Sequence, residues 1–301
     1  MSSTLTRGGT QTRGDQHGHR RSAGREGATK VRRRNVPAGV AGWVWLAVII
    51  VPIYWIVITS FKAQSDYFVQ NPLLPSPSPT LDNYRMVVEN DFVRYFVNSA
   101  VVTLGAVVPA VAFAFLAAYA VVRSGGRYVQ GVSRILLLGL AIPVQATIIP
   151  VYLIIIRLQL YDSLLALILP SVAFALPLSV LILGNFVRDV PRELFESMRL
   201  DGASEWQMAW RLAFPLTRPA IVTVCIYNGL QVWNGFLLPL VLTQSPDLRV
   251  LPLALWTFQG QYSVNVPAVL AAVVLSTLPI LVFYVVGRRQ LVSGLTAGFT
   301  K

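Results

Sequence analysis

Six stretches of this 301-residue sequence contain no charged residue, and each is long enough to cross a lipid bilayer. A transmembrane α-helix needs about 20 apolar residues. Only 13% of all residues are charged, whereas a soluble domain carries about a quarter. One stretch alone could form a buried helix of a soluble protein, but six in series leave little room for that explanation. We therefore predict an all-α, polytopic membrane helix bundle with six transmembrane helices, near residues 41–61, 96–121, 135–156, 164–186, 220–242 and 268–287.

The distribution of Lys and Arg predicts the orientation of the bundle, because these residues concentrate in cytoplasmic loops. With the N-terminus inside, all but five of the 25 Lys and Arg residues lie on the cytoplasmic side. The five outer residues are Lys62, Arg85, Arg94, Arg157 and Arg249. The reverse topology would invert this ratio, so both termini are predicted to be cytoplasmic (N-in/C-in).

Residues 1–38 are predicted to form a disordered basic cytoplasmic tail, followed by one transmembrane domain over residues 39–301. The tail is rich in Gly, Ser, Thr and Arg and poor in apolar residues, so it cannot form a packed core. The net charge of +12 would also fit a nucleic-acid-binding protein. We favour a tail that sets the topology and contacts anionic lipid headgroups, and we expect no nucleic-acid partner. The tail is too long for a cleavable signal peptide.

Metal and disulfide sites are not expected. Cys225 is the single cysteine and lies within the fifth predicted span, and the two histidines, His17 and His19, lie in the tail. The predicted spans also contain no charged residue. Carriers driven by protons or ions place acidic or basic groups inside the bundle, so the sequence argues against an autonomous ion-driven carrier.

The fifth predicted span carries neutral polar residues. Tyr227, Gln231 and Asn234 are spaced at i, i+4 and i+7, which places them on one face of a continuous helix. Such groups could hydrogen-bond a solute, or they could join helices to one another. The sequence leaves both interpretations open.

A polar segment, residues 189–218 (the 189–218 loop), separates the fourth and fifth spans and is predicted to form a helix–turn–helix. Gly202 suits the left-handed turn that ends a helix. Ser204 begins the second helix, with Gln207 at the reciprocal position of a capping box. Pro215 is expected to end that helix. An amphipathic pair lying on the membrane surface is the alternative, and the order of residues argues against it.

That order resembles the EAA loop of ABC-importer permeases, which reads Glu-Ala-Ala, then Asp-Gly-Ala, then aliphatic–x–Leu–Pro. Ser197 and Met198 replace the two alanines and Phe214 replaces the leucine. The matching residues are Glu196, Asp201, Gly202, Ala203, Leu212 and Pro215.

Other short motifs resemble the carbohydrate branch of this family, the maltose-permease type, and extend the resemblance over about residues 40–301. They are Pro52-Ile53-Tyr54-Trp55, Asn83-Tyr84, Trp233-Asn234, Leu251-Pro252-Leu253 and Gly294-Leu295-Thr296-Ala297-Gly298. The C-terminal Gly-Leu-Thr-Ala-Gly points to sugar importers in particular.

The resemblance implies a permease subunit of the bacterial plasma (inner) membrane, which is not an enzyme. Two permease subunits, expected to be a heterodimer, would form the pore above a cytoplasmic ABC ATPase dimer, and an extracytoplasmic solute-binding protein would deliver the sugar. ATP and Mg²⁺ would be used by the ATPase, and this chain would bind no cofactor; it has no Gly-Lys pair and hence no Walker A motif.

The resemblance also implies roles for individual residues. The 189–218 loop would enter a cleft of the ATPase, with Glu196 pairing with a basic residue there and Gly202 setting the bend. Tyr227, Gln231, Trp233 and Asn234 are the candidates for the substrate path, because hydroxyl and amide groups beside an aromatic ring suit a sugar.

Three alternatives remain. A closely related one is an ABC permease for another small solute, such as an amino acid or a peptide. An autonomous secondary carrier or channel would show intramembrane charges or an inverted repeat, and neither is visible. A membrane enzyme would need a motif such as His-Glu-x-x-His or Gly-x-Ser-x-Gly, which the sequence lacks.

Overall fold

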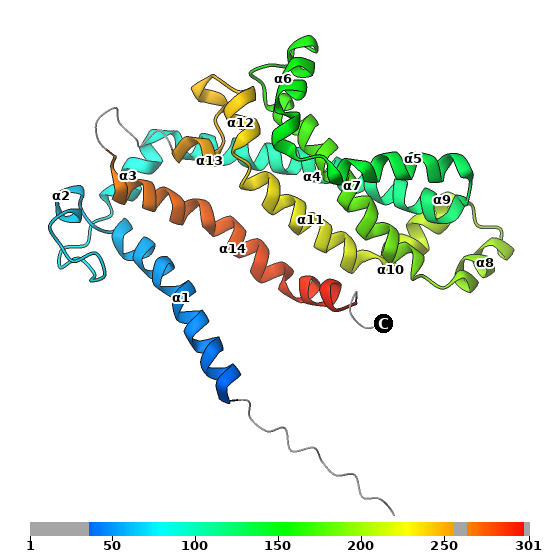
Figure 1. The fold of residues 1–301 in the computed structure, drawn as a ribbon, viewed down its shortest axis with the longest axis horizontal. Coiled ribbons are helices and arrows are strands. Elements are labelled where there is room, and N and C mark those ends of the chain that lie inside the picture. Colours follow the sequence, from blue (N-terminus) through cyan, green and yellow to red (C-terminus); the bar gives the residue numbers. More distant parts are fainter. Residues whose placement is uncertain (1–35, 256–263, 298–301) are drawn as a thin grey trace, which may run out of the picture. The chain divides into compact units, whose positions relative to one another are not determined.

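The computed structural model describes residues 36–255 and 264–297, and the regular elements in those ranges are all helices. The prediction of an all-α fold is confirmed for this part of the chain. Residues 1–35 of the predicted tail, including His17 and His19, and Gly298 of the C-terminal motif lie outside the described residues. The α-helices (Figure 1) are α1 (Val36–Ser60), α2 (Gln64–Tyr67), α3 (Asp82–Val87), α4 (Val93–Ser124), α5 (Arg127–Leu138), α6 (Ile148–Arg157), α7 (Leu164–Arg188), α8 (Arg192–Leu200), α9 (Glu205–Met208), α10 (Phe214–Leu216), α11 (Arg218–Trp233), α12 (Leu237–Leu242), α13 (Leu251–Ala254) and α14 (Val266–Ala297).

The chain divides into two units, residues 1–48 and 49–301. In the first unit, the described residues 36–48 form the beginning of α1. Their large apolar side chains are exposed, with Trp43 at 74% and Trp45 at 66%. A helix that is hydrophobic on all sides belongs in an apolar environment such as lipid. α1 begins at Val36. The first helix therefore starts slightly before residue 38, where the predicted tail is expected to end.

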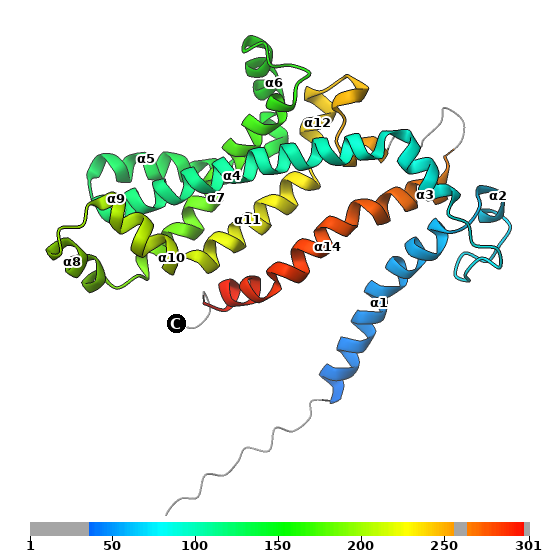
Figure 2. The same ribbon diagram turned by 180° about the vertical axis from the view of Figure 1, so that it is seen from behind.

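In the second unit, α4 packs along α7, and α11 lies against both helices (Figures 1 and 2). Small side chains on α4 permit this close packing. At Gly105, a β-carbon would lie 2.8 Å from Cδ1 of Ile168 on α7. The fully or almost fully buried alanines of α4 recur at every fourth residue: Ala106, Ala110, Ala114 and Ala118.

Three described helical segments are long and apolar enough to cross a membrane, namely Gly39–Ser60, Asp82–Ser124 and Leu164–Arg188. A fourth candidate is the pair Arg127–Ala141 and Val144–Arg157, which is bent by 102°. The predicted span 135–156 is therefore not one straight helix. Its break falls at Ile142 and Pro143, both in extended conformation, because proline disfavours helical backbone in the residue before it.

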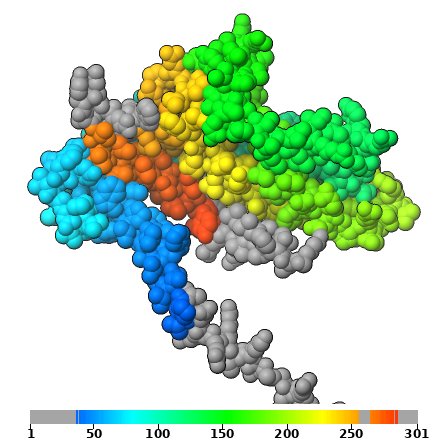
Figure 3. All heavy atoms as spheres, viewed as in Figure 1, coloured from blue at the N-terminus to red at the C-terminus, as the bar shows by residue number. Residues whose placement is uncertain are grey.

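The predicted span 220–242 is also interrupted. α11 ends at Trp233, and α12 begins only at Leu237. α12 lies beside α6, as the gold and green atoms in Figure 3 show. The predicted span 268–287 lies within α14, whose short apolar part is Val266–Val282. The arrangement of six spans with both termini inside stays a prediction.

Side-chain hydrogen bonds fasten the N-terminal half of α4 to the segment that precedes α13. The amide of Asn98 donates to the carbonyl oxygens of Asp247 and Arg249, at 2.8 and 2.9 Å. The hydroxyl of Ser99 accepts the backbone N–H of Leu251 at 2.8 Å. Three hydrogen bonds, at Asp247, Arg249 and Leu251, thus hold this segment against α4, although it lies about 150 residues from α4 along the chain.

The Asn83-Tyr84 motif has a structural role in the described fold. The buried amide of Asn83 donates to the carbonyl oxygens of Ser60 and Lys62, at 2.9 and 2.8 Å. Lys62 is itself only 1% exposed, and its ammonium group donates to the carbonyl oxygen of Asn71 at 2.7 Å. The end of α1 is thereby tied to α3 and to the loop between them.

Candidate functional site: the 189–218 loop and the polar face of α11

The first helix of the 189–218 loop, α8, is amphipathic. Pro191 precedes its first residue and is suited to the start of a helix because its fixed φ angle matches helical backbone. Phe195 is 2% exposed and faces the protein core, whereas Glu193 and Glu196 are exposed. No ion pair involving Glu196 is found within the part of the chain that the structure describes.

Gly202 forms the turn after α8, as predicted, with φ of +80°. The N–H of Gly202 donates to the carbonyl of Arg199 at 3.0 Å, and the N–H of Ala203 donates to that of Met198 at 2.9 Å. These two bonds form a Schellman motif, which satisfies the last carbonyls of a helix and requires left-handed backbone at the glycine position. A β-carbon on Gly202 would meet no atom within 4 Å. A substitution there would therefore be unfavourable because of the positive φ angle and not because of a steric clash with neighbouring residues.

The predicted capping box at the start of α9 is confirmed. The hydroxyl of Ser204 accepts the N–H of Gln207 at 3.3 Å, and the Gln207 side chain accepts the N–H of Ser204 at 2.9 Å. Because both bonds satisfy N–H groups that the helix cannot satisfy itself, the second helix has a fixed starting point directly after the Gly202 turn.

The prediction that Pro215 ends the second helix is wrong. α9 continues into a π-helical turn, Ala209–Ala213, and Pro215 lies inside α10, so the helical run reaches Leu216. A proline ring normally clashes with the carbonyl four residues earlier. The wider π turn, in which bonds connect residues five apart, accommodates the proline without stopping the helix.

The 189–218 loop packs against the C-terminal half of α4. Aromatic rings make part of the contact: Phe115 of α4 lies 5.7 Å from Trp210 and 5.4 Å from Phe214, measured between ring centroids. The buried residues of the loop that share one apolar cluster with α4, α7 and α11 are Val190, Phe195, Met208, Ala209 and Ala213.

Polar groups surround this apolar contact. The Tyr119 hydroxyl of α4 donates to Oε2 of Glu205 at 2.8 Å, and the other carboxylate oxygen of Glu205 pairs with Arg199. The bond from Tyr119, followed by that from Arg199, holds the pKa of Glu205 below its usual range against the opposing effect of burial. The Arg123 guanidinium lies 4.2 Å from the centre of the Phe195 ring, a distance at which a cation is attracted to a ring face.

The six residues that match the EAA pattern fall into two groups in the structure. Glu196, Asp201 and Gly202 are exposed at the end of α8 and in the turn. Ala203, Leu212 and Pro215 are half-buried, and Ala203 and Leu212 pack against the apolar cluster. The first group is available to a partner, and the second joins the loop to the rest of the chain.

The candidate substrate-path residues do not form one cluster. Tyr227 and Gln231 are exposed on α11, and the Gln231 amide donates to the Tyr227 hydroxyl at 3.4 Å. Asn234 is also exposed but lies just beyond the end of α11, where its amide donates to the carbonyl of Leu230 at 2.8 Å. Trp233 is instead 7% exposed and packs edge-on against Phe96, with 5.5 Å between ring centroids.

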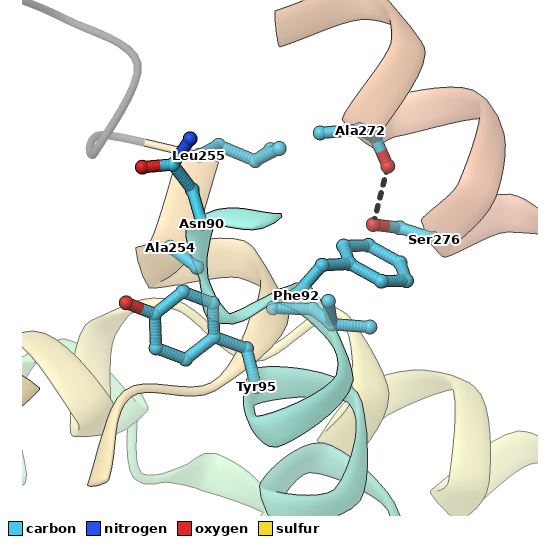
Figure 4. A pocket seen from close by; sticks show the side chains of 8 residues that line it. Asn90, Phe92, Tyr95, Ala254, Leu255, Ala272 and Ser276 are labelled. Carbon is cyan, nitrogen blue, oxygen red and sulfur yellow. Dashed lines mark hydrogen bonds between the residues drawn. The ribbon is translucent and has the colours of Figure 1, made fainter. Parts of the chain in front are cut away.

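Neither of two cavities beside these residues offers a sugar site within this chain. A small one near Ser276 of α14 has a volume of about 10 Å³, enough for a single water molecule. Figure 4 shows its lining residues, with the Ser276 hydroxyl bonded to the carbonyl of Ala272 at 2.7 Å. A cavity of about 220 Å³ between α4, α11 and α14 has an almost wholly apolar lining. Among the described residues no cluster of three or more His, Cys, Asp or Glu could hold a metal ion.

Four residues of this contact were not predicted from the sequence: Tyr119, Arg123, Arg199 and Glu205. Glu205 carries one local signal, since acidic residues favour the first turn of a helix. Its contact with Tyr119 joins residues 86 positions apart, and no sequence pattern within either segment indicates that contact.

Comparison with known proteins gives one family for the chain. Residues 110–291 match the binding-protein-dependent transport system inner membrane component family. The trehalose transport system permease protein SugB of Mycobacterium tuberculosis is 33% identical over 84% of this chain and 92% of its own length. The diacetylchitobiose uptake system permease protein DasC of Streptomyces coelicolor is 32% identical, also over 84% and 92%.

Solved structures share the fold. The crystal structure of a bacterial alginate ABC transporter in complex with an alginate pentasaccharide-bound periplasmic protein contains a chain with a TM-score of 0.58 to this one. That match covers 84% of this chain and 96% of the other, at 16% sequence identity. The match to the family spans more than half of the sequence, and relatives above 30% identity align over most of their length. The chain therefore belongs to the family of inner membrane components of binding-protein-dependent transport systems.

Proposed function

We propose that this chain is the transmembrane permease subunit of an ATP-driven, binding-protein-dependent importer of a sugar or oligosaccharide. The family match over residues 110–291 carries the proposal, because it includes the whole 189–218 loop. The names of the relatives support a sugar, since they state transport of trehalose and uptake of diacetylchitobiose. The family consists of transport components, so the prediction that the chain is not an enzyme is confirmed.

The proposed topology has six transmembrane spans in the bacterial inner membrane with both termini in the cytoplasm. The excess of Lys and Arg on the cytoplasmic side supports it. In this topology the bent pair around Pro143 counts as one span, and α11 with α12 as another. Backbone breaks at such positions are tolerated where neighbouring helices or water satisfy the freed polar groups. The domains are a basic tail, residues 1–38, and a permease domain, residues 39–301.

The 189–218 loop would be the docking element for a cytoplasmic ABC ATPase dimer. Two features support this role. The turn between its two helices is fixed by the Schellman motif at Gly202 and by the capping box at Ser204, which supports a loop that moves as a rigid body. Glu196 is exposed on α8, next to the buried Phe195 in the sequence, and would pair with a basic residue of the ATPase. ATP and Mg²⁺ would act in that partner, and this chain would need no cofactor.

The substrate path would run along the exposed face of α11. Tyr227 and Gln231 offer hydroxyl and amide groups there, and the exposed Asn234 offers a further amide just beyond the helix end. This chain would face a second permease subunit, expected to be a different chain, across the pore, and an extracytoplasmic solute-binding protein would deliver the sugar. Trp233 would contribute by holding α11 in place, because its ring packs inside the bundle.

Purification of the tagged chain from its native membranes, followed by mass spectrometry, tests the proposal. We expect an ABC ATPase and a second polytopic permease to be recovered with it. The complex with its binding protein is then reconstituted in liposomes and supplied with labelled trehalose, diacetylchitobiose, maltose or methionine. Uptake of a sugar supports the proposal. Uptake of methionine alone would favour the amino-acid alternative, and recovery of this chain alone would favour an autonomous carrier.

The Glu196→Lys variant tests the docking role. We expect it to reduce uptake at least tenfold while the amount of assembled complex in the membrane stays the same. Glu193→Lys is the matched control, because Glu193 is exposed on the same helix but matches no position of the EAA pattern. Unchanged uptake by Glu196→Lys would show that this carboxylate does not dock the ATPase.

A further inference from the structure

The 189–218 loop is connected by the chain to α7 and α11 but not to α4. α7 ends at Arg188 and α11 begins at Arg218, so any displacement of the loop moves these two helices directly. α4 ends at Ser124, far earlier in the sequence. Motion of the loop can reach α4 only through contacts between side chains.

Most of those contacts are apolar and do not fix a register. Phe115 packs against Trp210 and Phe214, and Tyr119 lies 6.4 Å from Phe195 between ring centroids. Apolar side chains attract one another without directionality, so these contacts specify the relative position of the two segments by shape alone. A directional bond is needed to make the two segments move together.

The bond from Tyr119 to Glu205 is directional. Its donor is an almost buried hydroxyl of α4, with Tyr119 at 8% exposure, and its acceptor is a carboxylate in the first turn of α9. Hydrogen bonds with a charged partner are about twice as strong as neutral ones. The low pKa of Glu205 keeps the acceptor ionised at neutral pH.

Two arginine side chains lie near the carboxylate, and one of them pairs with it. Arg199, at the end of α8, pairs with the second oxygen of Glu205, so one carboxylate joins α4, α8 and α9. Arg123 lies one turn beyond Tyr119 on α4, and its guanidinium covers Phe195 of α8. Its Nε atom is buried without a hydrogen-bond partner among the described residues.

We infer that Glu205 is a positioning residue for energy coupling, which fixes the 189–218 loop to α4 through the Tyr119 hydroxyl. The inference rests on the proposed function of the chain as an ATP-driven importer subunit. Without the bond the loop still docks and the ATPase still turns over, but α4 follows the loop only through its packing on α7 and α11. The movement of α4 is then no longer matched to that of the loop, and less solute is transferred per ATP hydrolysed.

The sharpest variant is Tyr119→Phe, which removes one oxygen atom and keeps the ring that packs against Phe195. Tyr128→Phe is the matched control, because Tyr128 is 85% exposed on α5. In reconstituted complexes with the binding protein and the ATPase, we expect Tyr119→Phe to lower the amount of sugar taken up per ATP hydrolysed at least fivefold. The ATPase rate and the amount of assembled complex stay within twofold of wild type.

The Glu205→Gln variant and the double variant show whether the two residues act as one unit. We expect Glu205→Gln to lower the ratio of uptake to hydrolysis as Tyr119→Phe does, and the double variant to be no worse than the more affected single one. Effects that multiply in the double variant would show that the residues act independently and would overturn the inference.

A distance measurement separates this role from general destabilisation. Spin labels are placed at Ser124 on α4 and at Glu193 on α8, both exposed, in a chain with Cys225→Ala. In the wild-type background the distance distribution should be the same with and without ATP and vanadate, since α4 and the loop move together. In the Tyr119→Phe variant, the distance distribution should broaden or shift when ATP and vanadate are added.

An unchanged ratio of uptake to hydrolysis and an unchanged distance distribution in Tyr119→Phe would overturn the inference. The failure of the proposed function looks different, because the wild-type chain would then show no uptake dependent on the binding protein and ATP.

Discussion

The indole N–H of Trp233, at the end of α11, donates to the carbonyl oxygen of Ser276 on α14 at 3.3 Å. The bond points the indole into the bundle, toward Phe96 of α4, and away from the exposed face that carries Tyr227 and Gln231. Trp233 therefore joins three helices at one place.

The variant Trp233→Phe should lower the stability of the chain by about 1 kcal/mol, the usual contribution of one hydrogen bond, because phenylalanine keeps a ring but has no N–H. Thermal unfolding of the detergent-solubilised protein measures the loss. Gln231→Ala is the comparison variant. We expect it to leave the stability unchanged and to weaken sugar transport. If Trp233→Phe impaired transport at wild-type stability, the indole would belong to the substrate path itself.

Gly202→Ala should destabilise the 189–218 loop by about 1–2 kcal/mol, the cost of left-handed backbone for a residue with a β-carbon. Gly202→Asn should cost less, because asparagine tolerates this conformation. Hydrogen exchange of the loop amides in the purified protein reports the local opening. Equal protection in wild type and both variants would show that the φ angle of this turn is not what holds the loop closed.

Gly105→Ala should destabilise the packing of α4 on α7 by about 1–3 kcal/mol, the usual range for overpacking, because the new carbon would lie 2.8 Å from Cδ1 of Ile168. Ile168→Val removes that Cδ1 atom. The double variant should therefore be more stable than the sum of the two single changes predicts, by the logic of a double-mutant cycle. Additive losses in melting temperature would place the strain elsewhere.

Asp162 gives a prediction on pH. Its carboxylate accepts the Ser245 hydroxyl and the backbone N–H groups of Ser245 and Gln244, the last two at 3.0 and 2.8 Å, and these bonds lower its pKa. A lowered pKa in the folded state means that the stabilisation is complete above the unfolded value of about 3.9 and is lost as the pH falls through the folded value.

The Asp162→Asn variant checks this prediction. It should melt at a lower temperature than wild type at pH 7. The difference should shrink as the pH falls below about 3.9, because the carboxylate is protonated first in the unfolded chain and then, at its lowered pKa, in the folded protein. A difference in melting temperature that stays constant across this range would mean that the charge of Asp162 contributes nothing to the contact.

Features of the 189–218 loop that depend on neighbours in the sequence could be predicted. The capping box of Ser204 and Gln207 and the turn at Gly202 each rest on residues within five positions of one another, and the structure confirms both. The contact between Tyr119 and Glu205 could not be predicted, because it depends on how α4 packs against the loop.

The breaks within the predicted spans have a different cause. The absence of charge identifies a stretch that lipid can surround, but it carries no information on whether the backbone runs straight through it. Pro143 breaks one such stretch. The break after Trp233 lies at Asn234 and Gly235, and a β-carbon on Gly235 would lie 3.0 Å from the carbonyl oxygen of Val232. The face expected to include Asn234 therefore ends with the helix.

The packing of the 189–218 loop on α4 also has a consequence for biosynthesis. Chains are made from the N-terminus and their parts fold in that order, so Phe115 and Tyr119 are already in place when the loop leaves the ribosome. The loop can then acquire its final neighbours before α14 has been synthesised. A nascent chain stalled just after α11 should already protect the loop from protease, and the last helix would join a segment whose docking surface is complete.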